Sequence, residues 1–174
     1  LDTQLDHFTA KMKVHPLKFE KFNGRIHYED KHLVVEEFSG KLGHSEFLTT
    51  LHWYLGDDES VKKRDNHFEL IAKKLDFDEL FNYNPPPAIA SVGAEKVDHD
   101  AGFNIYELPF TDMTYHVDVG SLNYHRYKLT NVKGEFTTTP DHMLFVDQLY
   151  CTAAGGDWDV RGMFDGSDPD HIYF

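Results

Sequence analysis

A strict alternation of apolar and polar residues runs through much of this chain, and it is clearest between residues 128 and 164. Near the end of that stretch, every second residue is apolar or glycine: Trp158, Val160 and Gly162. The residues between them are charged. A period of two is typical of a β-strand with one dry face and one wet face. The turn at Thr139–His142 and the Gly155-Gly156 pair divide the stretch into three strands, because proline and glycine favour turns.

The same strand pattern occurs earlier in the chain, beginning at Lys18. The matched segments are Phe22–Ile26 with Val132–Phe136, and Leu33–Glu36 with Leu144–Asp147. Gly134 lies 110 positions after Gly24, and a break at Gly43 takes the place of the later Gly155-Gly156 pair. A recurring strand–turn–strand–Gly–strand unit predicts a repetitive β architecture. We therefore expect an all-β, mainly antiparallel fold.

Two units separated by a linker follow from this repeat. We assign residues 1–83 to the first unit and residues 103–174 to the second. Residues 84–102 begin with Asn84 and three prolines and show neither the helical nor the strand period, so they are predicted to form a linker or mobile loop.

One short helix is expected near residues 76–83. Asp76 can cap its first turn, and Asp78 and Glu79 suit the positive end of the helix dipole. The charged stretch from Gly56 to Asn66 is predicted to be a loop. Phe8–Val14, where apolar and polar residues alternate, is predicted to form a half-buried strand.

These motifs resemble the AsmA-like family of Gram-negative cell-envelope proteins. The first unit ends in Phe68–Phe81, which is similar to a strand followed by a short helix in that family, and Ala153–Gly162 resembles its glycine break. The resemblance covers roughly residues 17–82 and 103–174; the acidic insert at 57–65 and the segment 84–101 depart from it.

The resemblance implies a function and a location. AsmA-like proteins are regarded as bridge-like lipid transporters of the periplasm, anchored to the inner membrane and contributing to phospholipid trafficking and outer-membrane biogenesis. It therefore implies that lipid acyl chains and neighbouring repeats of the same protein are partners of this chain. It also implies that any contact with the membrane is made by segments outside this chain.

Composition excludes several classes of partner. The formal net charge of −13 gives no electrostatic basis for binding nucleic acid or an anionic membrane surface. No apolar run approaches the roughly 20 residues of a membrane-spanning helix. The single cysteine, Cys151, lies in an alternating strand and is expected to be a packed small residue.

No pattern in the sequence indicates catalysis or a cofactor. The 12 histidines are scattered singly, without the H-E-x-x-H or C-x-x-C spacing of metal sites. The oxygen-rich stretch Asp165–Asp170 lacks the bidentate glutamate of a calcium loop. No G-x-S-x-G motif or Cys–His pair is present. We therefore expect no enzyme activity, no catalytic residues, no metal and no cofactor.

The remaining candidate site is the dry face of the strands. Its candidate residues are Phe47, Leu51, Trp53, Leu55, Trp158 and Val160. A one-sided sheet must cover its apolar face with something. Either the repeats form an open, apolar groove that holds acyl chains, or two sheets close into a β-sandwich that serves as a protein- or glycan-binding module. Alternation along a strand does not distinguish these two arrangements.

Overall fold

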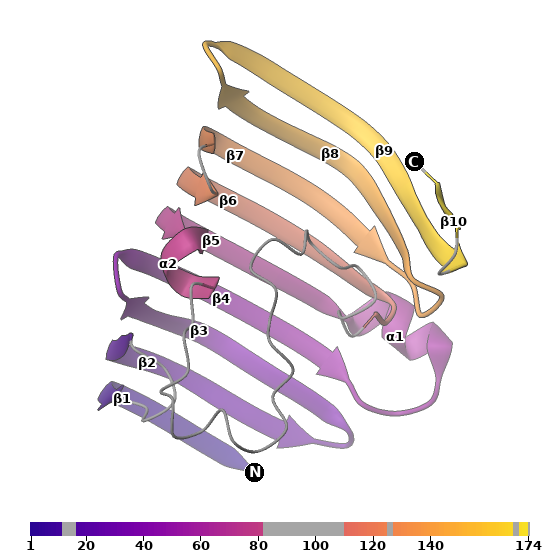
Figure 1. Cartoon of the computed structure of the whole chain (residues 1–174). Coiled ribbons are helices and arrows are strands. Elements are labelled where there is room, and N and C mark those ends of the chain that lie inside the picture. The colour runs from indigo at the N-terminus through magenta and orange to yellow at the C-terminus, as the bar shows by residue number, and fades with distance from the viewer. Residues whose placement is uncertain (12–16, 82–109, 125–126, 169–170, 174) are drawn as a thin grey trace, which may run out of the picture.

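The computed structural model of this chain describes residues 1–11, 17–81, 110–124, 127–168 and 171–173. The described strands form one sheet of ten strands in the order of the chain (Figure 1). They are β1 (Asp2–Lys11), β2 (Lys18–Glu29), β3 (His32–Leu42), β4 (Ser45–Tyr54), β5 (His67–Asp76), β6 (Met113–Tyr124), β7 (Tyr127–Thr138), β8 (Met143–Ala153), β9 (Gly156–Asp168) and β10 (His171–Tyr173). The predicted all-β, mainly antiparallel fold is confirmed.

Two short helices accompany the sheet in the described part of the chain. Helix α2 (Phe77–Phe81) lies within the range predicted for a helix. Helix α1 (Glu59–Asp65) occupies the stretch predicted to be a loop, so that prediction was wrong. The Asp58 carboxylate accepts hydrogen bonds from the backbone N–H groups of Ser60 and Val61, which caps the helix. A charged helix with no buried residue carries no apolar period, and its capping aspartate was the only signal for it.

The first strand also differs from its predicted position. β1 begins at Asp2, well before the predicted strand start at Phe8, because Asp2–Leu5 pair with Gly24–His27 of β2. This pairing partner lies about twenty residues away in sequence and is invisible to a local pattern. Residues 12–16, which include the predicted end of the strand, lie outside the described residues.

Neighbouring strands are antiparallel except at one place, where β5 and β6 pair in parallel. Parallel neighbours need a long crossover, and here 36 residues separate Asp76 from Met113. The parallel pair follows from the order of the strands. In an antiparallel series of five, β1 and β5 point the same way, so a second series that begins in the direction of β1 must run parallel to β5.

Side-chain amides hold this parallel junction. Asn66, just before β5, is 2% exposed. Its side chain accepts a hydrogen bond from Tyr54 N–H at 2.7 Å and donates one to the Asp112 carbonyl at 2.8 Å. At the other end of β5, Asn123 of β6 donates to the Asp76 carboxylate at 3.1 Å. Both ends of β5 are thus tied to β6 or to the residues that lead into it.

Irregularities of the sheet recur with the spacing of the sequence repeat. Between β3 and β4 the register shifts from Val35 to Phe38, and between β8 and β9 it shifts from Val146 to Leu149, which are the matched positions. The shift between Glu20 and Asn23 in β2 likewise recurs between Thr130 and Lys133 in β7. Bulges of this kind insert one residue and increase the local twist.

Unusual backbone conformations recur as well. The left-handed region, which is uncommon for residues other than glycine, is occupied at three matched pairs of positions. These are Lys21 (φ 55°) with Asn131 (φ 52°), Lys31 (φ 66°) with His142 (φ 61°), and Gly43 (φ 61°) with Ala154 (φ 51°). β1–β4 therefore correspond to β6–β9 in order and at these matched bulges and turns, although the two register shifts between β1 and β2 have no counterpart between β6 and β7. The assignment of separate units 1–83 and 103–174 stays a prediction, and the linker assigned to 84–102 lies outside the described residues.

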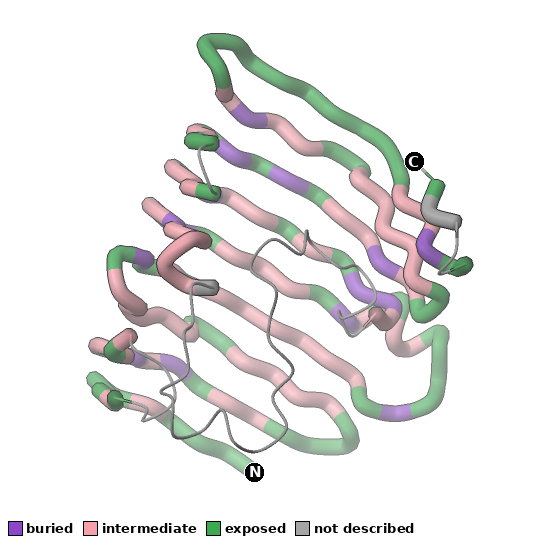
Figure 2. Tube along the Cα trace, viewed as in Figure 1, coloured by how far each residue is buried: buried purple, intermediate pink, exposed green. Residues whose placement is uncertain are grey.

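Buried residues lie on several strands of the sheet, including β2, β5, β7 and β8 (Figure 2). The buried cluster comprises Ala72, Leu75, Val119, Val132 and Cys151, contributed by β5 to β8. Cys151 is therefore a packed small residue, as expected from its strand. β9, by contrast, is exposed along its first eight residues, Gly156–Met163.

The two copies fill one matched site with different volumes. In the first copy, Phe22 is buried opposite Gly40, and a Cβ added at Gly40 would lie 2.8 Å from the Phe22 ring. In the second copy, the same positions hold Val132 and Cys151, both buried. A large side chain facing glycine is replaced by two smaller side chains.

This exchange predicts a coupled pair of substitutions. Gly40→Cys alone should destabilise the fold because the new side chain clashes with the Phe22 ring. Phe22→Val alone should cost roughly 1–3 kcal/mol for the cavity it leaves. The double variant, which installs the pair of the second copy, should be more stable than the sum of the two changes by about 0.5–3 kcal/mol. Urea unfolding of all four proteins measures this coupling, and strict additivity would contradict the repeat correspondence.

Candidate functional site

The sheet has one apolar face, which we define as the face that carries Ala72, Val119 and Val132. Partners across neighbouring strands share a face, so the strand register arranges this face into rows. One row crosses the sheet through seven consecutive apolar residues, and we refer to it as the central row. It comprises Ile26, Val35, Leu51, Phe68, Tyr115, Phe136 and Val146, from β2 to β8. All seven are half-buried.

The central row passes through the parallel junction without interruption. Phe68 of β5 pairs with Tyr115 of β6, and their rings pack edge to face with centroids 6.0 Å apart. At its far end, Val146 pairs with Gly162 of β9. Residues of the first and second copies therefore share one apolar surface.

The structure brings together some of the residues predicted from sequence. Phe47 and Leu51 lie on the apolar face, Phe47 packing against the buried cluster and Leu51 standing in the central row. Trp158 pairs with the buried Cys151, and Val160 pairs with Leu149, which places both on the same face. Phe47 and Trp158 occupy matched positions in the two copies.

The other two predicted residues lie toward the opposite end of β4. Trp53 pairs with Leu33 of β3 and is half-buried. Leu55 follows the last residue of the strand, and its N–H donates a hydrogen bond to the Lys31 carbonyl. Leu55 is therefore part of the connection after β4 and not of a strand face. The structure does not bring it together with Phe47 or Trp158.

Sequence reasoning missed three aromatic members of the central row, Phe68, Tyr115 and Phe136. Side chains alternate between the two faces of a strand, so the face of each of these residues can be worked out within its own strand. Their alignment into one row depends on the register between strands and on the parallel pairing of β5 with β6. A local pattern contains neither.

Helix α2 covers one end of the apolar face, in front of β4 and β5 (Figure 1). Phe77, its first residue, packs against the buried cluster and contacts the Tyr124 ring with centroids 6.3 Å apart. Glu79 reaches the β3–β4 turn, where its carboxylate accepts hydrogen bonds from His44 N–H at 2.7 Å and from His44 Nδ1 at 3.0 Å. The apolar residues of the cluster that Phe77 contacts are thus buried, whereas those of the central row are only half-buried.

Gly43 leaves room for this contact. A Cβ at Gly43 would lie 2.5 Å from the Glu79 carboxylate, and the residue has a φ of 61°. Both the close approach and the left-handed backbone favour glycine at this position.

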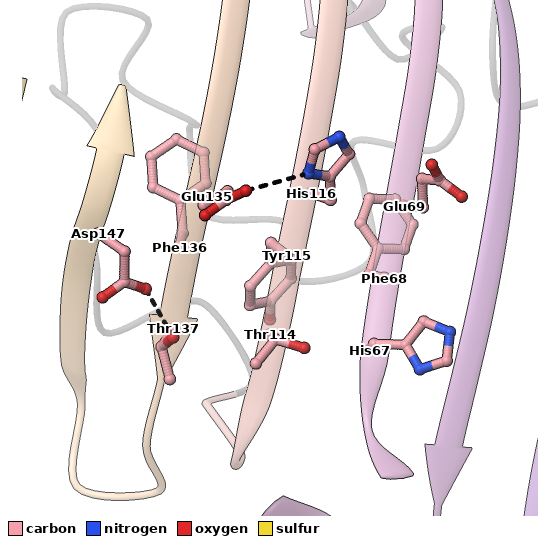
Figure 3. A pocket seen from close by; sticks show the side chains of 10 residues that line it. All are labelled: His67, Phe68, Glu69, Thr114, Tyr115, His116, Glu135, Phe136, Thr137 and Asp147. Atoms are coloured by element: carbon pink, nitrogen blue, oxygen red, sulfur yellow. Dashed lines mark hydrogen bonds and ion pairs between the residues drawn. The ribbon is translucent and has the colours of Figure 1, made fainter. Parts of the chain in front are cut away.

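The opposite face of the sheet is polar and carries a shallow hollow of about 330 Å³ over β5 to β8 (Figure 3). An ion pair joins His116 and Glu135 at 3.9 Å, and Thr137 donates a hydrogen bond to Asp147 at 2.8 Å. The hollow is lined by His67, Glu69, Thr114, His116, Glu135, Thr137 and Asp147, together with the central-row residues Phe68, Tyr115 and Phe136, which alternate with them along the same strands. Imidazoles and carboxylates alternate here, but no three His, Cys, Asp or Glu side chains of the described residues lie close enough together to hold a metal ion.

Two histidines stack on this polar face. The rings of His52 and His67 lie on neighbouring strands with centroids 4.2 Å apart. Burial lowers the pKa of His52 below its ordinary value of 6.5, and the neighbouring His67 lowers it further. At the sheet edge, by contrast, a hydrogen bond with Asp2 raises the pKa of His27 above 6.5.

Comparison of the sequence with protein families and with curated proteins, and of the fold with solved structures, found no match. Within the described residues, no helix has the length and apolar character that crossing a bilayer requires.

The contact between Glu79 and His44 predicts how α2 is held. Glu79→Ala removes the acceptor for two hydrogen bonds and should destabilise α2 by about 1 kcal/mol. Hydrogen exchange of the α2 amides should accelerate. His44→Ala, the matched control, keeps the backbone N–H donor and should have a smaller effect. An equal effect of both variants would show that the imidazole, and not the backbone hydrogen bond, holds the helix.

The two shifted histidines predict opposite effects of acid. Because the pKa of His52 is lowered in the folded state, the unfolded chain binds its proton more readily, so His52 subtracts stability as the pH falls below 6.5. The pKa of His27 is raised, so His27 adds stability below 6.5 that is lost as the pH rises through its folded-state value.

The stability of each variant is compared with that of the parent protein at the same pH. As the pH falls from neutral to below 6.5, this difference should shift in favour of His52→Gln and against His27→Gln. Urea unfolding on both sides of pH 6.5 measures the two differences. Differences of the same sign in the two variants would contradict the assignment.

Proposed function

We propose that this chain is a non-enzymatic segment of an AsmA-like cell-envelope protein, and that it contributes to phospholipid trafficking or outer-membrane assembly. In this proposal the apolar face carries the acyl chains of a lipid. The observation that carries the proposal is the central row, which runs through both copies and across the parallel junction while staying half-buried.

The geometry of the face suits an acyl chain better than a compact ligand. Neighbouring strands of a sheet lie about 4.8 Å apart, so the single row of seven side chains from β2 to β8 offers a long, narrow surface and not a closed cavity. Its apolar character supplies the favourable term for hydrocarbon, about 25 cal/mol per Å² of apolar surface removed from water. The opposite face of the sheet carries polar side chains and can stay in contact with water while the apolar face holds a lipid.

The surface is most open in the second copy. Trp158 is 54% exposed and Val160 41% exposed, whereas Phe47, which matches Trp158, packs against the buried cluster. Contiguous exposed apolar side chains normally mark a binding surface. A closed β-sandwich would need a second sheet over this face, and the described residues form a single sheet.

The proposal extends to the protein as a whole. A translational repeat of five strands can continue in both directions, so neighbouring repeats of the same protein would lengthen the apolar face. The resemblance that motivates the proposal implies a periplasmic location and an inner-membrane anchor outside this chain. The net charge of −13 supports the expectation that the chain itself does not bind nucleic acid.

A matched pair of charge substitutions on β9 tests the proposal. Val160 lies on the apolar face and is 41% exposed, and Met163 lies on the polar face of the same strand and is 40% exposed. Val160→Glu should reduce lipid pick-up about tenfold or more, because an acyl chain would have to desolvate the carboxylate. Met163→Glu should leave it unchanged.

The measurement is the transfer of a fluorescently labelled phospholipid from phosphatidylcholine vesicles to the protein, read by native electrophoresis. Leu51→Glu extends the test to the central row, with a thermal melt beside the lipid assay. A folded Leu51→Glu protein that no longer takes up lipid supports the proposal. No uptake by the parent protein, or an equal loss in the Val160 and Met163 variants, would overturn it.

A further inference from the structure

Two histidines lie side by side on the polar face, near the end of the sheet where the connection containing α1 joins β4 to β5. His52 of β4 pairs with His67 of β5, and their ring centroids are 4.2 Å apart with 27° between the ring planes. His67 is exposed and His52 is half-buried, so solvent reaches the pair. Figure 3 shows the His67 ring turned away from Thr114, on the side of β4. The two histidines are 15 positions apart in the chain, so a motif of short spacings does not detect them.

The repeated architecture does not require a histidine at position 52. Leu51 and Gly162 occupy matched positions beside the bulge of each copy, so the residue that matches His52 is Met163. An apolar side chain thus serves the same strand position in the second copy. The imidazole is a property of the first copy and not of the strand pattern that both copies share.

The hydrogen bond of His67 leaves one of its ring nitrogens free to act as a ligand. Its Nδ1 lies 3.2 Å from the carbonyl oxygen of Asp65. A carbonyl oxygen can only accept, so Nδ1 donates and Nε2 presents its lone pair. Histidines that bind metals usually donate their second nitrogen in this way, which fixes the orientation of the ring. Among the described residues no hydrogen bond ties the ring of His52, so either of its nitrogens can serve as the second ligand.

The spacing of the two rings suits nitrogens that bind one metal ion. With the metal about 2.0–2.1 Å from each nitrogen and a right angle between the two bonds, the ring centroids lie roughly 4.5 Å apart. The observed separation of 4.2 Å is close to this value. Because the rings are stacked, rotations about the side-chain bonds are needed to bring the two nitrogens to a common point, but the strands themselves need not move.

Charges around the pair favour a cation. Burial contributes most to lowering the pKa of His52, and His67 and His32 act in the same direction. The carboxylates of Glu36 and Asp65 act against them, so two negative charges stand near the site. A neutral imidazole keeps the lone pair that a metal needs, and nearby carboxylates attract a divalent cation.

We propose that His52 and His67 form a binding site for a divalent transition metal, with one imidazole nitrogen from each strand and water in the remaining positions. Imidazole suits Cu²⁺, Ni²⁺ and Zn²⁺, and affinity is greatest for Cu²⁺. In the described part of the chain no third His, Cys, Asp or Glu side chain completes the set, so the site keeps open positions, unlike a closed structural site. The metal ties β4 to β5 across the connection that contains α1. The site lies on the polar face and does not depend on lipid binding.

Copper binding by the full chain tests this site. Calorimetric titration with copper(II) chloride is carried out well above the ordinary imidazole pKa of about 6.5, so that protons do not compete for the nitrogens. The parent protein should show one dominant site per chain. His52→Gln and His67→Gln should each weaken this binding about tenfold or more, because each removes one of the two ligands. His116→Gln removes an exposed histidine of the same face outside the pair and should leave binding unchanged.

Electron paramagnetic resonance of the copper-loaded proteins counts the nitrogens. The parent protein should show two equatorial imidazole nitrogens, and this measurement needs no variant. Each variant of the pair should show at most one, and thermal melts without metal should show that every variant is folded. No binding by the parent protein, or a parent spectrum with a single imidazole, would overturn the proposal. Undiminished binding in either variant of the pair, or an equal loss in His116→Gln, would do the same, because the copper would then be an adventitious ion only.

Discussion

The parallel pairing of β5 with β6 determines how the rest of the sheet is built. An antiparallel series of five strands ends in the direction in which it began, so a second series can repeat the first by translation only if the junction is parallel. Parallel pairs need a long crossover and are slightly less stable per residue. The buried Asn66 and the Asp76–Asn123 hydrogen bond compensate by tying both ends of β5 to the strand beside it or to its lead-in.

A translational repeat has a physical consequence for the apolar face. A rotation about an axis in the plane of the sheet would turn the dry face of the second copy to the wet side of the first. Translation keeps both dry faces on one side, which is why Leu51, Phe68, Tyr115 and Phe136 stand in a single row across the junction. The fold therefore doubles the length of an apolar surface without doubling the thickness of the sheet. The proposed lipid-binding role uses this surface.

The copies differ where their surroundings differ. Phe22 facing Gly40 and Val132 facing Cys151 fill the same buried site with different divisions of volume. Phe47 packs against the buried cluster, whereas its counterpart Trp158 is 54% exposed. The first copy is thus closed at one end by a helix. The second copy presents the apolar side chains Trp158 and Val160 of β9 to solvent.

The amino-acid sequence alone determined most of the strands and their dry faces, because alternation and turn residues act within a few positions of the chain. It also placed Phe47, Leu51, Trp158 and Val160 on the apolar side of their own strands. It did not reveal α1, whose charged residues carry no apolar period. It also grouped Leu55 with residues of a strand face, although Leu55 lies in the connection after β4.

Tertiary structure decided which strands are neighbours, and therefore which side chains share a row. Register between strands arises from hydrogen bonds and packing between residues far apart in sequence, and a slip of one residue would move every side chain to the other face. For this reason Phe68, Tyr115 and Phe136 became one surface only when β5 and β6 paired. The openness of that surface was likewise set by the single-layer arrangement of the described strands and not by any local pattern.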